Sequence, residues 1–91
     1  MAKYIIVNRS QSKCEGKVRH YTRYYCGVMA AGGFLIERWD SNKKKDAYVF
    51  DNKAVVNRYF REHRLDAISD AGWCKTGYNR YQKDVFEVIK L

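Results

Sequence analysis

The chain has 91 residues, of which 46% are hydrophobic and 15% aromatic, and its 18 Lys and Arg against 10 Asp and Glu leave a net charge of +8. This length predicts one domain, residues 1–91, whose single small core has no room for a cofactor or a small-molecule substrate, so any site should lie on the surface. The composition excludes a disordered chain and a membrane-spanning helix, and the positive charge predicts a polyanionic partner.

The first elements are predicted from apolar runs and their polar boundaries. Tyr4–Val7 is short, apolar and β-branched, which indicates a buried central strand that begins near Lys3 and ends by Asn8. The polar residues 10–16 predict a loop. Residues 17–26 are rich in β-forming side chains and predict a second strand, although some of their apolar residues also fit helical spacing.

The second predicted strand has two different faces, because alternate side chains of a strand point in opposite directions. One face, Val18 to Tyr24 in steps of two, is available to a core. The other alternates cations with aromatic rings, which suits phosphates and unpaired bases. It is equally consistent with side chains that merely cover a half-exposed strand. The candidate binding residues from this stretch are Lys17, Arg19, Tyr21, Arg23 and Tyr25.

Residues 27–33 contain three glycines and predict a flexible connection or a bulged turn. They do not predict a phosphate-binding loop, because a strand-like segment and not a helix follows them. Two apolar runs, 34–39 and 47–50, flank a polar segment and predict a hairpin. Its tip would carry Lys43, Lys44 and Lys45, either as a solvated turn that protects a sheet edge or as a prong that contacts phosphates.

A helix is predicted from about Asn52 to Arg64, with Asp51 as its N-cap. At helical spacing an apolar arc, which should pack on the sheet, contains Val55, Val56, Tyr59, Phe60 and His63. A second arc of Lys53, Asn57, Arg61 and Arg64 is basic. It is either the solvated back of the helix or a further contact for the polyanion, for which Arg61 and Arg64 are the candidates.

The remaining residues predict a long polar segment and a final strand. Residues 65–83 are punctuated by glycine, and so long a connection in a small domain usually has a function or contains a short element. Within it, Tyr78, Arg80, Tyr81 and Lys83 repeat the basic and aromatic pattern of residues 17–25. Of these, Tyr78 and Arg80 are further candidates, while Trp73 is expected to anchor the segment to the core. Residues 85–89 predict the last strand. The order of elements predicts an α+β fold with an antiparallel sheet of about four to five strands and one amphipathic helix packed on one face.

Cellular location and metal content are predicted from the first residues and the cysteines. Residues 1–9 contain no apolar segment of signal-peptide length, so a cytoplasmic location is expected. Cys14, Cys26 and Cys74 cannot all pair within one chain, which favours free thiols in a reducing compartment. Their spacing from His20 and His63 does not match a structural zinc site. We therefore predict neither a metal nor a cofactor.

The sequence contains no hydrolase, nucleotide-binding or zinc-finger motif. Three functional hypotheses follow from the candidate residues. The first is a non-catalytic protein that binds single-stranded RNA or DNA, a ribonucleoprotein or an acidic protein surface. The second is a small metal-independent ribonuclease of the toxin type, whose first candidates are Arg19, His20, Arg23, Tyr78 and Arg80. The third is an inhibitor that covers a patch on another protein, with Trp39 and Trp73 as anchors. Both a monomer and a dimer are compatible with the sequence.

Three segments carry a resemblance to a known group. They are Trp-Asp followed by Asp-Ala-Tyr-Val-Phe-Asp-Asn-Lys-Ala before the helix, the opening Lys-Tyr-Ile-Ile, and the closing Phe-Glu-Val-Ile. In these segments the chain resembles small phage-encoded accessory proteins, which include anti-CRISPR inhibitors. The resemblance implies inhibition by binding, in the host cytoplasm, of a guide-RNA-loaded effector or of its DNA site. It assigns no functional residue.

Overall fold

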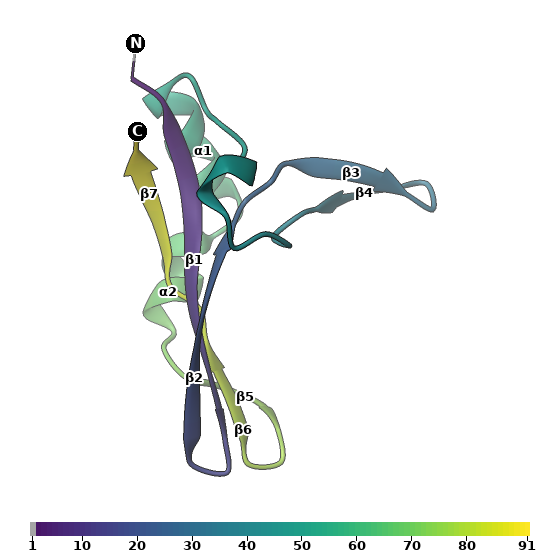
Figure 1. Ribbon diagram of the computed structural model, residues 1–91, viewed down its shortest axis with the longest axis vertical. Helices are drawn as coiled ribbons and strands as arrows, with labels where there is room; N and C mark the ends of the chain where they lie inside the picture. The colour runs from purple at the N-terminus through teal and green to yellow at the C-terminus, as the bar shows by residue number, and fades with distance from the viewer. Residues whose placement is uncertain (1) are drawn as a thin grey trace.

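One long strand, β1 (Tyr4–Cys14), lies at the centre of the main sheet in the computed structural model, which describes residues 2–91 (Figure 1). One edge of β1 pairs with β2 (Lys17–Tyr24). The other edge pairs first with β7 (Phe86–Lys90) and then with β6 (Arg80–Lys83), which in turn pairs with β5 (Cys74–Gly77). Every pairing is antiparallel. The α+β class, the antiparallel sheet and the central position of Tyr4–Val7 are confirmed.

The first strand extends well beyond its predicted end, and the loop expected over residues 10–16 is wrong. Residues 10–14 continue β1, and residues 11–14 pair on both edges, so the ladder satisfies their backbone groups although their side chains are polar. The chain then reverses at Glu15 and Gly16, whose φ values are 51° and 82°. Two positive φ values in a two-residue turn match the twist of a β-hairpin.

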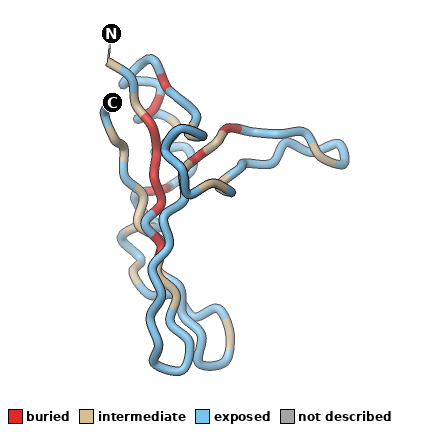
Figure 2. Tube along the Cα trace, in the orientation of Figure 1, coloured by how far each residue is buried: buried red, intermediate tan, exposed pale blue. Residues whose placement is uncertain are grey.

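The core surrounds only one end of β1. Ile5, Ile6 and Val7 are each at most 1% exposed, and because three consecutive strand residues point to both faces, both faces are covered there (Figure 2). Ile6 packs in a cluster with other buried side chains, and half-buried aromatic residues surround it. The buried members are Ile6, Tyr25, Phe50, Val56 and Leu65.

The predicted helix is α1 (Lys53–Glu62), and a second short helix, α2 (Leu65–Asp70), follows it. The N-cap is Asn52 and not Asp51, because the Asn52 side-chain oxygen accepts hydrogen bonds from the backbone N–H groups of Ala54 and Val55 at 2.7 and 3.4 Å. In the predicted apolar arc, Val56 is fully buried, and Tyr59 and Phe60 pack against the core. Val55 is 40% exposed, so the packed face is narrower than expected.

The predicted hairpin of residues 34–39 and 47–50 is wrong. Instead β4 (Phe34–Glu37) pairs with β3 (Val28–Ala31) across a turn at Gly32 and Gly33, both of which have positive φ. The glycines that suggested a flexible connection therefore form a tight hairpin turn. Of residues 47–50, only Phe50 makes a bridge, to Tyr4.

The segment 65–83 is not a single loop. It contains α2 and the β5–β6 hairpin, whose turn has Asn79 at a φ of 53°. Trp73 is 42% exposed, so the prediction that it anchors the segment in the core is wrong. The last strand, predicted over residues 85–89, is β7 (Phe86–Lys90), one residue further along the chain.

Candidate nucleic-acid interface

The part of the main sheet away from the core forms a single layer that we call the paddle, defined as residues 9–23 and 74–83. The β1–β2 and β5–β6 hairpins extend together beyond the helices, and their turns lie side by side, where the Glu15 N–H donates to the Asn79 carbonyl at 3.2 Å (Figure 1). All of β2 from Lys17 to Arg23 is exposed. The paddle contains one acidic residue, Glu15, and eight cationic ones, namely Arg9, Lys13, Lys17, Arg19, Arg23, Lys75, Arg80 and Lys83.

The front face of the paddle carries the predicted cations and ring. Residues directly opposite in an antiparallel pair share a face, so Arg19 lies beside Ser12, and Tyr21 beside Ser10. Cys14 lies between Lys17 on one side and Arg80 on the other, which places Arg80 on the same face. The structure therefore brings together five of the predicted residues: Lys17, Arg19, Tyr21, Arg23 and Arg80.

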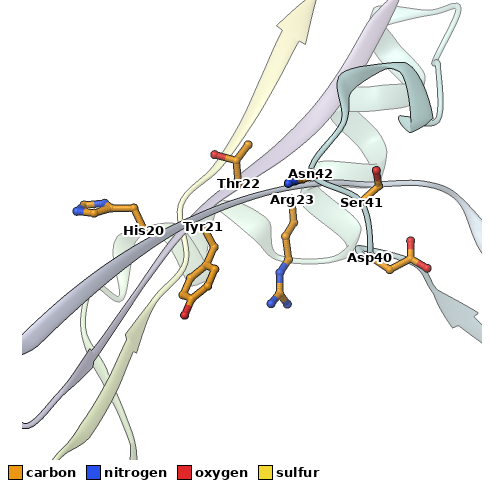
Figure 3. Close-up of a pocket in the computed structure, with 7 residues that line it drawn as sticks. All are labelled: His20, Tyr21, Thr22, Arg23, Asp40, Ser41 and Asn42. Carbon is orange, nitrogen blue, oxygen red and sulfur yellow. The ribbon is translucent and has the colours of Figure 1, made fainter.

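Tyr21 and Arg23 form the middle of this face. Both point to the same side of β2, whereas Thr22 points to the other (Figure 3). The Arg23 guanidinium carbon lies 5.8 Å from the centre of the Tyr21 ring, within the range of a cation–π interaction. The ring, which is 39% exposed, thus has a flat surface available beside a positive charge.

Two surface hollows flank Tyr21 along β2. One, of about 330 Å³, is lined by residues that include Lys17, Arg19 and Tyr21. The other, of about 460 Å³, is lined by His20, Tyr21, Thr22, Arg23, Asp40, Ser41 and Asn42 (Figure 3). Because both hollows include Tyr21, they form one continuous track along β2, the edge strand of the sheet, and this track includes His20 and Thr22 as well as the front-face residues.

Asp40 is the one acidic side chain in the second hollow, and Arg38 neutralises it. The Arg38 Nε lies 3.3 Å from Asp40 Oδ2. Hydrogen bonding from Arg38 lowers the pKa of Asp40 below its ordinary value. Among the residues that line this hollow, Arg23 therefore carries the one charge that has no ionic partner.

The reverse face of the paddle was not predicted. Lys13 lies opposite Val18 on one side and Tyr81 on the other, and Tyr81 lies opposite Lys75, so a row of four side chains crosses the sheet. In the next row Gln11 lies between Lys83 on one side and His20 on the other. The expected core face of β2 is thereby corrected, since Val18 is 45% exposed and no second layer covers it among residues 2–91. The alternation of residues 80–83 beside Asn79 was the signal for this hairpin.

Tyr25 does not belong to the front face, and its selection as a binding residue is wrong. It is 5% exposed and lies in the core, where its ring contacts Trp39, Tyr48, Phe50 and Tyr59. β2 ends at Tyr24, and the Tyr25 N–H donates to the Ile6 carbonyl at 3.0 Å. The alternation that placed Tyr25 beside Arg23 ends with the strand.

The three lysines do not form a hairpin tip. Lys44 and Lys45 lie in a short 3₁₀ helix, Lys44–Asp46, that follows Ser41 and Asn42. Lys43 lines a hollow of about 510 Å³ that shares Asp40, Ser41 and Asn42 with the hollow beside Tyr21. Lys43 therefore extends the track, and the structure gives no such link for its two neighbours.

The other predicted residues lie apart from the front face. Arg61 is in the last turn of α1, and Arg64, with a φ of 54°, lies between the two helices, outside the paddle. Tyr78 lies at the β5–β6 turn, where it is 88% exposed. The helix arginines are thus separate from the track, and Tyr78 lines neither of its two hollows.

A cluster around Glu37 was missed because its members are far apart in sequence. The Glu37 carboxylate accepts hydrogen bonds from the Tyr59 hydroxyl and from Trp39 Nε1, and lies 3.1 Å from His63 Nδ1. Burial, and then the hydrogen bond to Glu37, raises the pKa of Tyr59. The cluster ties β4 to α1, and because Tyr59 holds its proton firmly, it provides no nucleophile.

No protein-family model matches the sequence, and neither the curated proteins nor the solved structures contain a significant match to this chain. The resemblance to phage-encoded accessory proteins stays a prediction. Within residues 2–91, no helix is long and apolar enough to cross a membrane, and no three His, Cys, Asp or Glu side chains gather as metal ligands.

Proposed function

We propose that this chain is a non-catalytic nucleic-acid-binding protein that binds a single strand of RNA or DNA along the front face of the paddle. The observation that carries the proposal is the position of Tyr21, an exposed ring between two hollows with Arg19 and Arg23 on either side of it in β2. A base stacks on an aromatic side chain, and guanidinium groups bind the phosphates that flank it.

The charge distribution supports the same proposal. Arg9 is paired with Glu87 at 3.0 Å, and the other seven cations of the paddle, against one acid, attract a polyanion. Stacking on a ring does not depend on base identity. We therefore expect binding with weak sequence preference and strong salt dependence. A nucleoprotein that exposes a strand is an equally suitable partner by this chemistry. That the partner is a guide-RNA-loaded effector rests on the resemblance alone.

The ribonuclease alternative keeps one candidate pair of residues. His20 points to the reverse face of β2 and Arg23 to the front face, but both line the hollow of about 460 Å³ beside Tyr21. A general base and the cations that stabilise a phosphorane must reach the same phosphate, so the length of the probes after binding distinguishes the two functions. The contact between His63 and Glu37 lies outside the paddle.

The proposal is tested by fluorescence-anisotropy titration of labelled single-stranded RNA, single-stranded DNA and duplex DNA. The front variant, Arg19→Ala with Arg23→Ala, should bind single strands far more weakly than the wild type. The matched control is the reverse variant, Lys75→Ala with Lys83→Ala, which removes the same charge from the other face of the same paddle and should retain most of the affinity.

Two outcomes would contradict the proposal. Equal losses in the two variants would mean that net charge, and not the front face, determines binding. Probes that are shortened when run on a gel after the titration would indicate a nuclease.

A further inference from the structure

The β3–β4 hairpin, which we call the arm (residues 28–37), projects away from the core and from the paddle (Figure 1). Its nine residues from Val28 to Ile36 are all apolar or glycine. Phe34 and Leu35 are 74% and 78% exposed, and Val28, Met29 and Ile36 are each at least 46% exposed. So large an apolar surface on a small basic protein marks a site of interaction.

The arm is apolar on both faces and open at both edges. Met29, Ile36, Ala31 and Phe34 share one face, and Val28, Ala30 and Leu35 share the other. Among the described residues, residues 28–37 make no backbone hydrogen bond outside the β3–β4 ladder. An isolated two-stranded hairpin is marginal in water, so the arm needs a partner that covers its side chains and pairs with its edge.

We propose that the arm binds the arm of a second copy of this chain, edge to edge and antiparallel, to form a two-fold symmetric dimer. A hairpin edge is complementary to itself under a two-fold axis, which is the symmetry of most homodimers. Lipid is a poor alternative, because hydrocarbon leaves the N–H and C=O groups of an open edge unsatisfied.

Charge selects the arm as the surface through which two copies meet. Each copy has a net charge of +8, so most approaches bring like charges together. The stretch from Val28 to Ile36 carries no charge and projects from the body, so arms can meet while the two paddles stay apart (Figure 1). A second copy thereby covers the apolar side chains of the arm, pairs with its open backbone edge and keeps the basic surfaces of the two copies apart.

The edge of β4 is the better candidate for the contact. In a two-residue hairpin, the residues that flank the turn form a hydrogen-bonded pair and the pairs then alternate, so the backbone groups of Leu35 point away from β3. β4 also carries three large exposed apolar side chains, Phe34, Leu35 and Ile36, whereas β3 carries two, Val28 and Met29. On β3 the outward-pointing residues are Ala30, which has little apolar surface to bury, and Val28, which lies opposite the charged Glu37 near the base of the arm.

The test is sedimentation-velocity analysis of the full chain without nucleic acid over a wide concentration range. The wild type should be a dimer, and the Phe34→Ser, Leu35→Ser variant a monomer. Each substitution occurs twice in the dimer, so four apolar side chains lose part or all of their burial, and the dissociation constant should rise at least about 100-fold. The control is Tyr78→Ser, which removes an equally exposed ring from the paddle turn and should leave the dimer intact.

Salt separates this inference from the proposed function. Added salt screens the repulsion between two basic copies and should strengthen the dimer, whereas it weakens binding to nucleic acid. The arm variant should have the melting temperature that the wild type has when diluted to a monomer, because the two residues lie outside the core and only dimerisation adds to the stability of the wild type. A wild type that stays monomeric at about 100 times the concentration used for nucleic-acid titrations, or an arm variant that still dimerises, would overturn the inference.

Discussion

Removal of two arginines from the front face should halve the salt dependence of single-strand binding. The face presents four cations, Lys17, Arg19, Arg23 and Arg80, and each phosphate contact contributes about −0.7 to the slope of log K against log salt for a single strand. The wild type should therefore have a slope of about −2.8, and the Arg19→Ala, Arg23→Ala variant a slope of about −1.4.

The difference is large enough to measure. From about 50 mM to about 150 mM salt, the wild type should lose affinity about 20-fold and the front variant about fivefold. The assay is the anisotropy titration with one labelled single strand, repeated at several salt concentrations on both proteins and on the Lys75→Ala, Lys83→Ala variant. The reasoning is refuted if the front variant retains the wild-type slope while the reverse variant loses half of it, because the contacts would then lie on the other face.

Three further predictions concern stability. Val56→Ala should lower the free energy of unfolding by about 1.5–3 kcal/mol and the melting temperature by on the order of 10 °C, because Val56 is fully buried. Val55→Ala, at a 40% exposed position of the same helix, should change the free energy of unfolding by less than about 0.5 kcal/mol. Asn52→Ala should cost about 1 kcal/mol in chemical denaturation through loss of the cap, whereas a larger loss from Asp51→Ala would argue for the other cap residue. The pKa of Tyr59 is raised in the folded state, so above pH 10.0 the unfolded chain releases this proton while the native chain keeps it, and the wild type loses stability. The stability advantage of the wild type over Tyr59→Phe should therefore shrink from about pH 9 to about pH 11. A difference in stability that stays constant over this range would contradict the raised pKa.

The fold class followed from strong local patterns. Tyr4–Val7 and Phe86–Lys90 are apolar strands, and residues 53–62 have helical periodicity with a capping residue beside them, so their types were predictable. The arm was missed because residues 27–33 were interpreted as a flexible connection or a bulged turn, although a pair of glycines, here Gly32 and Gly33, is also a two-residue hairpin turn. Residues 28–36 are apolar or glycine throughout, and such a run is typical of a buried strand, so the sequence did not indicate that both faces of the arm are exposed.

The candidate site was predictable only as far as one strand determines it. The alternation of β2 placed Lys17, Arg19, Tyr21 and Arg23 correctly on one face. The same rule failed at Tyr25, because the end of a strand depends on tertiary contacts. The contributions of Arg80, Lys75 and Lys83 required knowledge of which strands are neighbours, and the Glu37 cluster required contacts between segments distant in sequence.

The length of β1 gives one strand two different environments. Ile5 to Val7 lie in the core, whereas beyond Arg9 the same strand is held by its hydrogen bonds and by pairs of polar side chains. Backbone amides in the paddle should therefore exchange with solvent through local opening, much faster than those a few residues earlier in the same strand. A bound polyanion that bridges neighbouring strands would take the place of the missing second layer, so the ligand itself would complete the folding of this part of the protein.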